Sequence, residues 1–461
     1  KEIVMAQELI ISISGMRGLV GDNLFPETAA AYSSAFGSFL KQRHSDKKLS
    51  VAVGRDSRPS GPMISSAVAS GLSAVGIDVV ELGICSTPAV GVMLRHLNCD
   101  GGIVITASHN PIPYNGIKLL LENGIAPPKD MAEQIIQMYH QKQFSFIDSL
   151  NCGRIGANDQ ANQVHLDKVL AIIDKDIIAS KRFKVVLDSV NGAGGPEAVM
   201  LLEALGCDVV CMNTEPTGIF AHTPEPTAEN LTSLCQKASE SGAEIGFAQD
   251  PDADRLAIVD EQGNYIGEEF TLAFASNYVF SKLPGTAAVN LSTSRMIDDI
   301  AKQAGCTVYR TPVGEANVAN AMVEYGCVIG GEGNGGVIDL RVGPIRDSLV
   351  GMALVLGLLT ESGKTVSQLA AELGGYAIYK SKYPADKHQA VAIIEKAKCV
   401  FTDAVVNTSD GCRFDLPDGW IHIRSSNTEP IMRIIVETKD AETAHSYMEQ
   451  IEAIRTHVLG S

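Results

Sequence analysis

The sequence predicts an α/β protein made of three similar α/β units followed by a smaller α+β unit. Short apolar runs alternate with helical stretches, and this pattern restarts twice along the chain. The segment 371–461 differs, because it reads as antiparallel strands and turns flanked by helices. A length of 461 residues is ample for several domains. No low-complexity linker separates the units, so we expect them to pack around a shared cleft.

The first unit, residues 1–153, begins the alternation of strands and helices. The stretches 62–75 and 89–97 predict helices. Three short, mostly apolar runs predict strands at residues 49–53, 79–82 and 103–105. Strands that alternate with helices are typical of a parallel sheet.

The second unit, residues 154–262, begins within a polar passage rich in asparagine. Its predicted strands cover residues 185–187, 209–211 and 245–248. The third unit, residues 263–370, repeats the pattern with strands at 287–291, 308–309 and 328–329 and a helix at 348–359. We therefore expect two more α/β units of the same kind.

The fourth unit, residues 371–461, is predicted to be α+β. Helices are expected at 388–400 and 442–457. Strands joined by turns are expected at residues 376–379, 412–416, 420–423 and 432–437.

Composition narrows the possible functions. Lys and Arg number 37 against 54 Asp and Glu, giving a net charge of −17, which argues against nucleic acid and anionic membranes as partners. An anionic substrate would then require a local cationic pocket. The ten cysteines form no C-x-x-C pairs, which disfavours structural zinc and indicates a reducing compartment, the cytoplasm by default. The most apolar run, 352–359, is too short to span a membrane, and no signal-like segment follows Lys1.

The motif Thr-Ala-Ser-His-Asn-Pro at 106–111 follows the predicted strand 103–105. Asn110 and Pro111 are turn formers that stop the strand, so Ser108 should be presented to a cleft rather than buried. By itself the segment also fits an ordinary strand-to-turn junction.

The motif Asp-Pro-Asp-Ala-Asp-Arg at 250–255 lies between two apolar runs. Asp250, Asp252 and Asp254 alternate along the loop, so their oxygens can converge on one hard cation. An acidic solvated turn is the alternative. A calcium EF-hand loop is excluded, because Arg255 stands where that loop needs glycine and 256–259 continues as a strand. With Arg255 as an anion partner, the pattern favours Mg²⁺ bound jointly by protein and phosphate.

Two further loops carry polar side chains suited to a sugar phosphate. In 424–430, hydroxyl and amide groups lie near Arg433 and can cradle a phosphate, although a polar hairpin turn is equally consistent. In 330–336, Glu332 and Asn334 stand among glycines and can bind vicinal hydroxyls, whereas a flexible glycine loop would leave both unexplained. The candidate phosphate ligands are Arg424, Ser426, Asn427, Thr428 and Arg433.

These four motifs together resemble those of the α-D-phosphohexomutase superfamily, which includes phosphoglucomutases, phosphomannomutases and phosphoglucosamine mutases. Matching segments at 14–18, 53–58, 186–192 and 346–347 extend the resemblance over essentially the whole chain. The resemblance implies a four-domain, heart-shaped fold around a central cleft. It also implies that Ser108 carries a phosphoryl group in the resting enzyme, and that one of its oxygens joins Asp250, Asp252 and Asp254 around Mg²⁺.

The resemblance implies a substrate site and a reaction as well. Glu332 and Asn334 would hold sugar hydroxyls, while Arg424, Ser426, Asn427 and Thr428 would bind the phosphate that does not react. Phospho-Ser108 would convert a hexose monophosphate into a bound hexose 1,6-bisphosphate, which turns round and returns its other phosphoryl group. The net reaction interconverts 6-phosphate and 1-phosphate. Mobility of the fourth unit would help its loop accept phosphate from either carbon.

A proton must leave the attacking hydroxyl, and Lys118 and His109 are the candidate acceptors. Lys118 would need a pKa lowered from about 10.4 toward 7 or 8, which Arg17 and Mg²⁺ could provide. The equally weighted alternative is that Lys118 only neutralises phosphate.

The form Gly-Glu-x-Asn-Gly-Gly, with Thr-Pro-Val-Gly-Glu-Ala-Asn at 311–317, is most like phosphoglucosamine mutase-type members. Glucose and mannose phosphates remain alternatives, since Asn334 stands where many relatives have serine. A metal-dependent phosphatase would not need the loop at Arg424, and a silent sugar-phosphate binding protein should have lost Ser108 or the aspartates. We expect a small-molecule substrate, no nucleic acid or membrane partner, and a monomer or homodimer.

Overall fold

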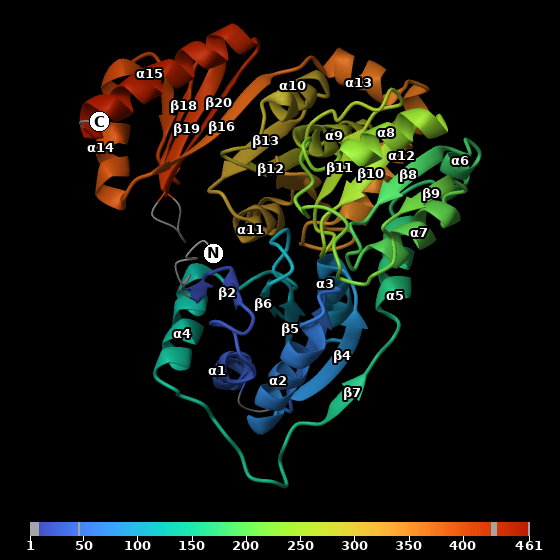
Figure 1. The fold of residues 1–461 in the computed structure, drawn as a ribbon, viewed down its shortest axis with the longest axis vertical. Coiled ribbons are helices and arrows are strands. Elements are labelled where there is room, and N and C mark those ends of the chain that lie inside the picture. Colours follow the sequence, from blue (N-terminus) through green and yellow to red (C-terminus); the bar gives the residue numbers. More distant parts are fainter. Residues whose placement is uncertain (1–8, 45–46, 426–430, 460–461) are drawn as a thin grey trace, which may run out of the picture.

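The computed structural model describes residues 9–44, 47–425 and 431–459. Within them the chain forms four sheets, one in each predicted unit. Figure 1 shows the four units following one another in chain order, with the fourth unit, in red, beside the third. The predicted architecture of three α/β units and one α+β unit is confirmed.

The first sheet has the order β1-β2-β6-β5-β3-β4-β7. Its strands are β1 Ile10–Ser12, β2 Gly15–Leu19, β3 Ser50–Arg55, β4 Asp78–Ile84, β5 Gly101–Ile105, β6 Tyr114–Leu121 and β7 Ile155–Ala157. β3, β4, β5 and β7 run parallel, but β6 pairs antiparallel with β5 and β2. The parallel arrangement predicted for the strands at 49–53, 79–82 and 103–105 is confirmed, and β6, which was not predicted, makes the sheet mixed. The short 106–113 connection turns the chain straight back into β6, where a parallel strand would need a longer crossover.

Helices cover both faces of this sheet. α1 Pro26–Arg43, α2 Gly61–Ala74 and α4 Lys129–His140 pack on one face, and α3 Thr87–His96 packs on the other. Alternate residues of β5 divide between the two cores, because successive strand side chains point to opposite faces. β5 is thus buried along its whole length, and its carboxyl end is fixed.

The second sheet has the order β11-β10-β8-β9. Its strands are β8 Lys184–Asp188, β9 Asp208–Met212, β10 Ile245–Gln249 and β11 Leu256–Val259, and its helices are α5 Ala161–Leu170, α6 Lys175–Ala179, α7 Gly195–Ala204 and α8 Thr232–Ser241. β10 and β11 pair antiparallel, so the 250–255 loop is the turn of a hairpin. This agrees with the predicted strand-to-strand loop.

The third sheet has the order β13-β12-β14-β15. Its strands are β12 Thr286–Asn290, β13 Thr307–Thr311, β14 Ile329–Glu332 and β15 Gly336–Ile338, and its helices are α9 Glu269–Lys282, α10 Met296–Gln303, α11 Glu315–Tyr325, α12 Ser348–Ser362 and α13 Val366–Leu373. One hydrophobic cluster contains residues of both the second and the third units, including Phe247 and Leu354. These two units therefore share a core.

The fourth sheet is antiparallel throughout, with the order β16-β20-β19-β18-β17. Its strands are β16 Ala377–Pro384, β17 Val405–Asn407, β18 Cys412–Asp415, β19 Gly419–Ser425 and β20 Ile431–Thr438. Helices α14 Lys387–Val400 and α15 Ala441–Leu459 pack against the sheet and form a separate core with it (Figure 1). The fourth unit thus has its own hydrophobic core.

Over the described residues, no single helix has the length and apolar character needed to cross a membrane. A bent pair, Ser348–Ser362 with Val366–Leu373 at 89°, meets those criteria only in combination. Residues 348–360 of the first helix are all buried in the protein. All ten cysteines are free.

Candidate active site

Ser108 lies directly beyond β5 in a strained turn. Its φ is +48°, a left-handed conformation that is uncommon outside glycine. The Thr106 hydroxyl accepts a hydrogen bond from the Ser108 amide at 2.9 Å and donates one to Asp56 at 2.7 Å. Ser108 is only 4% exposed, so the prediction that it is not buried is wrong. Its hydroxyl instead donates to Asp250 at 3.1 Å.

The buried side chain of Arg58 stabilises this turn by binding its backbone carbonyl groups. Its guanidinium is fully buried and donates to the carbonyl oxygens of Ser108 at 2.7 Å and Asn110 at 2.6 Å. Further bonds reach the carbonyls of Pro111 at 2.7 Å and Tyr114 at 3.1 Å. The planar fork of donors on arginine suits such a set of fixed acceptors. The local sequence does not reveal this role of Arg58, because the carbonyl groups that it binds lie at least 50 residues further along the chain.

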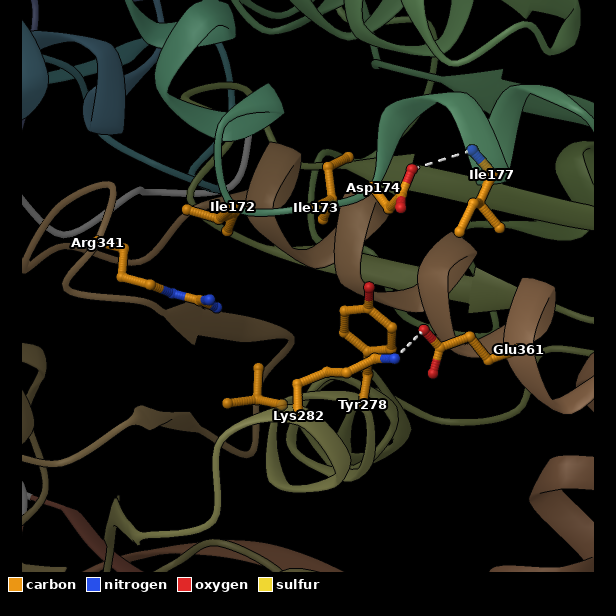
Figure 2. Close-up of a pocket in the computed structure, with 9 residues that line it drawn as sticks. Ile172, Ile173, Asp174, Ile177, Tyr278, Lys282, Arg341 and Glu361 are labelled. Atoms are coloured by element: carbon orange, nitrogen blue, oxygen red, sulfur yellow. Dashed lines mark hydrogen bonds and ion pairs between the residues drawn. The ribbon is translucent and has the colours of Figure 1, made fainter.

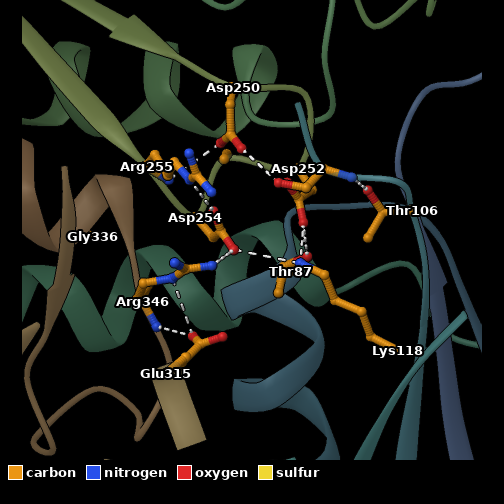
Figure 3. Close-up of polar contacts among 12 residues, drawn as sticks. Thr87, Thr106, Lys118, Asp250, Asp252, Asp254, Arg255, Glu315, Gly336 and Arg346 are labelled. Atoms are coloured by element: carbon orange, nitrogen blue, oxygen red, sulfur yellow. Dashed lines mark hydrogen bonds and ion pairs between the residues drawn. The ribbon is translucent and has the colours of Figure 1, made fainter. Parts of the chain in front are cut away.

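The hairpin between β10 and β11 brings three carboxylates together. Asp250, Asp252 and Asp254 are fully buried and each offers an oxygen within 4.8 Å of the others (Figure 3). The turn requires a left-handed φ of +56° at Ala253. Within the described part of the chain, one oxygen of Asp252 and one of Asp254 have no hydrogen-bond partner. Buried carboxylate oxygens without partners fit a bound cation, and a hard ion such as Mg²⁺ suits an all-oxygen set.

Cations already surround two of the three aspartates. Lys118 lies 2.7 Å from Asp252 and 3.4 Å from Asp254, and Arg346 lies 2.5 Å from Asp254. Burial opposes ionisation, but these cations hold the pKa values of Asp252 and Asp254 below their ordinary range. Burial and the two neighbouring carboxylates raise the pKa of Asp250. The site as a whole therefore favours additional positive charge.

His109 and Lys118 flank Ser108 and the aspartates. The His109 Nδ1 lies 3.3 Å from the Ser108 hydroxyl, and burial with nearby Arg255 and Arg17 lowers the pKa of His109 to about 3. Burial lowers the pKa of Lys118, but Asp252 and Asp254 raise it more, so the net shift is upward. This direction is opposite to the one that a Lys118 base requires.

The β14–β15 hairpin carries Glu332 and Asn334. Asn290 donates to Glu332 at 2.8 Å, Arg346 donates to it at 2.6 Å, and the Asn334 amide lies 3.5 Å away. Gly335 has a φ of +83°, and a side chain there would lie 2.3 Å from the carbonyl oxygen of Leu256. The hairpin thus packs directly on the start of β11. Arg346 joins the two loops, because its other nitrogen contacts Asp254 (Figure 3).

Arg424 on β19 and Arg433 on β20 are directly paired neighbours in the fourth sheet. The Nε of Arg424 lies 3.2 Å from Asp410. The other predicted phosphate ligands, Ser426, Asn427 and Thr428, lie outside the described residues.

A cleft of about 1270 Å³ is lined by all four units. Its cationic lining includes two lysines that the sequence analysis missed, Lys380 and Lys382 on β16. Their alternation along an edge strand was the one available signal, and it is equally common on strands without function. The lining includes His109 and Arg255, the chain neighbours of Ser108 and Asp254. The other cations in it are Arg17, Arg255, Arg424 and Arg433, and the acidic groups are Glu225, Glu268 and Glu332.

A second hollow of about 280 Å³ lies between the second and third units and contains none of the predicted site residues. Figure 2 shows its Lys282 paired with Glu361, at 2.5 Å. Arg341 beside it is bound to Asp339. The large cleft is therefore the candidate active site.

Comparison with known proteins supports this assignment. Four segments of the chain match the domain families of phosphoglucomutase/phosphomannomutase. Residues 9–146 match alpha/beta/alpha domain I, 163–263 domain II, 267–375 domain III and 380–454 the C-terminal domain. A phosphoglucomutase/phosphomannomutase of Thermococcus kodakarensis is 38% identical over 94% of this chain and 96% of its own. A probable phosphoglucosamine mutase of Methanopyrus kandleri is 34% identical over 95% of each chain.

A solved structure shares the architecture. A phosphoglucomutase/phosphomannomutase family protein from Burkholderia thailandensis superposes with a TM-score of 0.87 at 29% identity, covering 98% of both chains. The four domain matches, the full-length relatives and the shared fold together establish that this chain belongs to the phosphoglucomutase/phosphomannomutase family of phosphohexomutases.

Proposed function

We propose that this protein interconverts hexose 6-phosphate and hexose 1-phosphate through phospho-Ser108 and a hexose 1,6-bisphosphate. The observation that carries the proposal is a single cleft whose arginines come from separate units. Arg17 and Arg255 line it near His109, the neighbour of Ser108, and Arg424 and Arg433 line it from the fourth sheet. We propose that these two pairs bind the two phosphates of a hexose bisphosphate, whereas a phosphatase needs only the pair near Ser108.

In the proposed reaction, the free hydroxyl of the hexose monophosphate attacks the phosphorus of phospho-Ser108. The bond from phosphorus to the Ser108 oxygen breaks as the new bond forms, and the sugar hydroxyl loses its proton. The resulting bisphosphate turns round, and its other phosphoryl group passes to the Ser108 oxygen. This step regenerates the phosphoserine and releases the isomeric monophosphate.

The side chains around Ser108 position this exchange and stabilise its charge. Arg17 and Arg255 face the cleft beside Ser108, where they can neutralise equatorial phosphoryl oxygens. A Mg²⁺ ion held by Asp250, Asp252 and Asp254 would supply Lewis-acid stabilisation of phosphoryl charge. Glu332 and Asn334 would bind sugar hydroxyls and so fix which oxygen lies near Ser108.

The proton acceptor is proposed to be Lys118 or His109. A cation bound to Asp252 and Asp254 would weaken the ion pairs that now raise the pKa of Lys118. His109 is uncharged and has a nitrogen near Ser108, but its low pKa makes it a weak base. If Lys118 is not the base, its charge still neutralises phosphate.

We propose glucosamine 6-phosphate as the preferred substrate. Relatives named probable phosphoglucosamine mutase match at 34% identity, and the acidic groups Glu225, Glu268 and Glu332 in the cleft suit an ammonium on the sugar. Glucose or mannose phosphate is the second candidate, since the phosphoglucomutase/phosphomannomutase relative is 38% identical. A trace of bisphosphate should be needed to load Ser108. We expect a monomer or homodimer in the cytoplasm.

The test is a Mg²⁺-dependent assay, followed by ³¹P NMR, on glucosamine, glucose and mannose 6-phosphates, each with a trace of its 1,6-bisphosphate. We expect the 1-phosphate to form with the wild type and not with Ser108→Ala. Ser70→Ala, at an exposed position of α2, is the matched control and should retain turnover. Release of inorganic phosphate without 1-phosphate would overturn the proposal in favour of a phosphatase.

A further inference from the structure

A buried histidine outside the cleft binds two carboxylates at once. His165 on α5 has no exposed surface, and its Nε2 lies 2.5 Å from Asp347. Its Nδ1 is hydrogen-bonded to Glu197 on α7. Each ring nitrogen thus faces a carboxylate oxygen, and an imidazolium ring can donate a hydrogen bond to both partners at once. Burying a charged ring with two acidic partners costs desolvation free energy that their mutual attraction need not repay.

On one side, the contacts of His165 continue through residues of the first unit to the 250–255 loop that carries the three aspartates, here called the metal loop. Glu197 accepts a hydrogen bond at 2.7 Å from Ser86, the residue that caps α3. The next residue, Thr87, donates its hydroxyl to Asp252 at 2.7 Å and its amide to the Asp252 carbonyl at 2.9 Å. Glu197 therefore fixes the residue immediately before the one that orients Asp252.

On the other side, the contacts of His165 reach the same loop from the third unit. Asp347 caps α12 by accepting bonds from the amides of Leu349 at 2.9 Å and Val350 at 3.2 Å. The preceding residue, Arg346, donates to Asp254 at 2.5 Å and to Glu332 at 2.6 Å. Asp347 thus fixes the residue next to the arginine that orients Asp254.

We propose that His165 is a positioning residue for the metal loop, acting through Glu197 to Thr87 and through Asp347 to Arg346. By joining two carboxylates from different units, it sets the distance between the side chains that hold Asp252 and Asp254. Burial alone would lower the pKa of His165, but Asp347 and Glu197 raise it to about 10, so the ring keeps its charge at neutral pH. The measurements of metal binding and turnover rest on the proposed function, whereas the charge of the His165 ring can be tested without it.

The first test replaces the charge while keeping a polar side chain. In His165→Gln we expect the dissociation constant for Mn²⁺, followed by electron paramagnetic resonance, to rise about tenfold to a hundredfold, as for other residues that orient metal ligands. Turnover should fall by a similar factor, with a smaller change in KM. Val169→Ala, one turn further along α5 in the core, is the matched control for lost packing. It should lower thermal stability without weakening Mn²⁺ binding.

A second variant separates charge from packing. In His165→Gln the two buried carboxylates lose their shared cation, so adding Glu197→Gln removes one unbalanced charge. We expect the double variant to bind Mn²⁺ more tightly than His165→Gln, and to fold even where the single variant does not. Equal or weaker Mn²⁺ binding by the double variant would overturn the charge-based role.

A direct measurement tests the charge in the wild type. With ¹⁵N-labelled histidine, both ring nitrogens of His165 should give imidazolium signals at neutral pH, and a neutral ring would overturn the proposal. Wild-type Mn²⁺ affinity in folded His165→Gln would overturn the role of His165 alone. Failure of the wild type to bind Mn²⁺ would overturn the metal site itself, and would so be distinguished from failure of His165.

Discussion

Replacing Arg58 by methionine should both destabilise the protein and disorder the Ser108 turn. The Arg58 guanidinium has no exposed surface and lies 3.0 Å from Asp56, which is also buried. It donates to four backbone carbonyls between Ser108 and Tyr114. Methionine fills a similar volume but its side chain donates no hydrogen bond, so the carbonyls lose their guanidinium partner and Asp56 loses its countercharge, keeping only neutral donors such as the Thr106 hydroxyl.

The magnitude follows from the buried charge that remains. Removing one member of a buried ion pair costs about 3–5 kcal/mol, most of it from the uncompensated partner. Ser108 is held at a left-handed φ of +48°, so loss of its carbonyl contact should let the turn relax. A displacement of about 1 Å at a reacting group costs on the order of 10²-fold in rate. We therefore expect about 3–5 kcal/mol of lost stability and about a hundredfold loss of turnover.

The destabilisation should also depend on pH. Burial raises the pKa of Asp56 while Arg58 opposes this shift, so Arg58→Met should raise the pKa further. The folded state then holds a proton that the unfolded state releases, and stability falls as pH rises above the unfolded pKa of about 4. The loss should be larger at about pH 8 than at about pH 5.

Urea unfolding at both pH values and the mutase assay test this reasoning. Arg43→Met is the matched control, because Arg43 forms an exposed ion pair with Glu122 at 3.3 Å. Such a pair contributes about 0–1 kcal/mol. A loss for Arg58→Met no larger than for Arg43→Met, or normal turnover in a folded Arg58→Met, would refute the argument.

Three further predictions concern a buried carboxyl beside the cleft, the proposed base and the metal site. Burial, partly offset by Lys380, raises the pKa of Glu269 to about 8. The wild type should therefore lose up to about 1.4 kcal/mol of stability per pH unit between the ordinary pKa of a glutamate and pH 8. Urea unfolding should show a flatter dependence of stability on pH in Glu269→Gln. The same slope in both proteins would contradict this assignment. Lys118→Met should lower turnover about 10²-fold or more, and near-normal turnover would exclude a base role. Chelation should abolish turnover until Mg²⁺ is restored, and Asp254→Asn should raise the half-saturating Mg²⁺ concentration at least about tenfold, whereas an unchanged Mg²⁺ titration would count against the site.

Local patterns in the sequence predicted much of the fold. Each predicted strand of the first three units lies at an observed strand, and helices α2, α3 and α12 follow their predicted ranges closely. Strand order and direction were less accessible. β6 was missed, and with it the antiparallel pairing with β5 that makes the first sheet mixed. Apolar runs identify a strand, but its direction depends on how the chain turns between strands.

The candidate site also has features that the sequence predicted and features that it did not. The three aspartates converge as their spacing predicted, because alternate residues of one short loop share a side. The burial of Ser108 was not predicted, since it depends on segments distant in the chain that close over the turn. Lys380 and His165 were also missed, and the contacts of Arg58 with the Ser108 turn were not predicted although the segment 53–58 was singled out. Each acts through partners far away in sequence, and no local spacing marks such a residue.

The sequence by itself determined which side chains stand on the four loops and the α/β class, because turn formers, periodicity and residue type act locally. The tertiary structure decided which charges meet. Lys118 reaches Asp252 across 134 positions, and Arg346 reaches Asp254 across 92. These contacts exist because the second and third units share one core and the first packs against them. Only that packing brings a buried serine, three carboxylates and their cations into contact with one another.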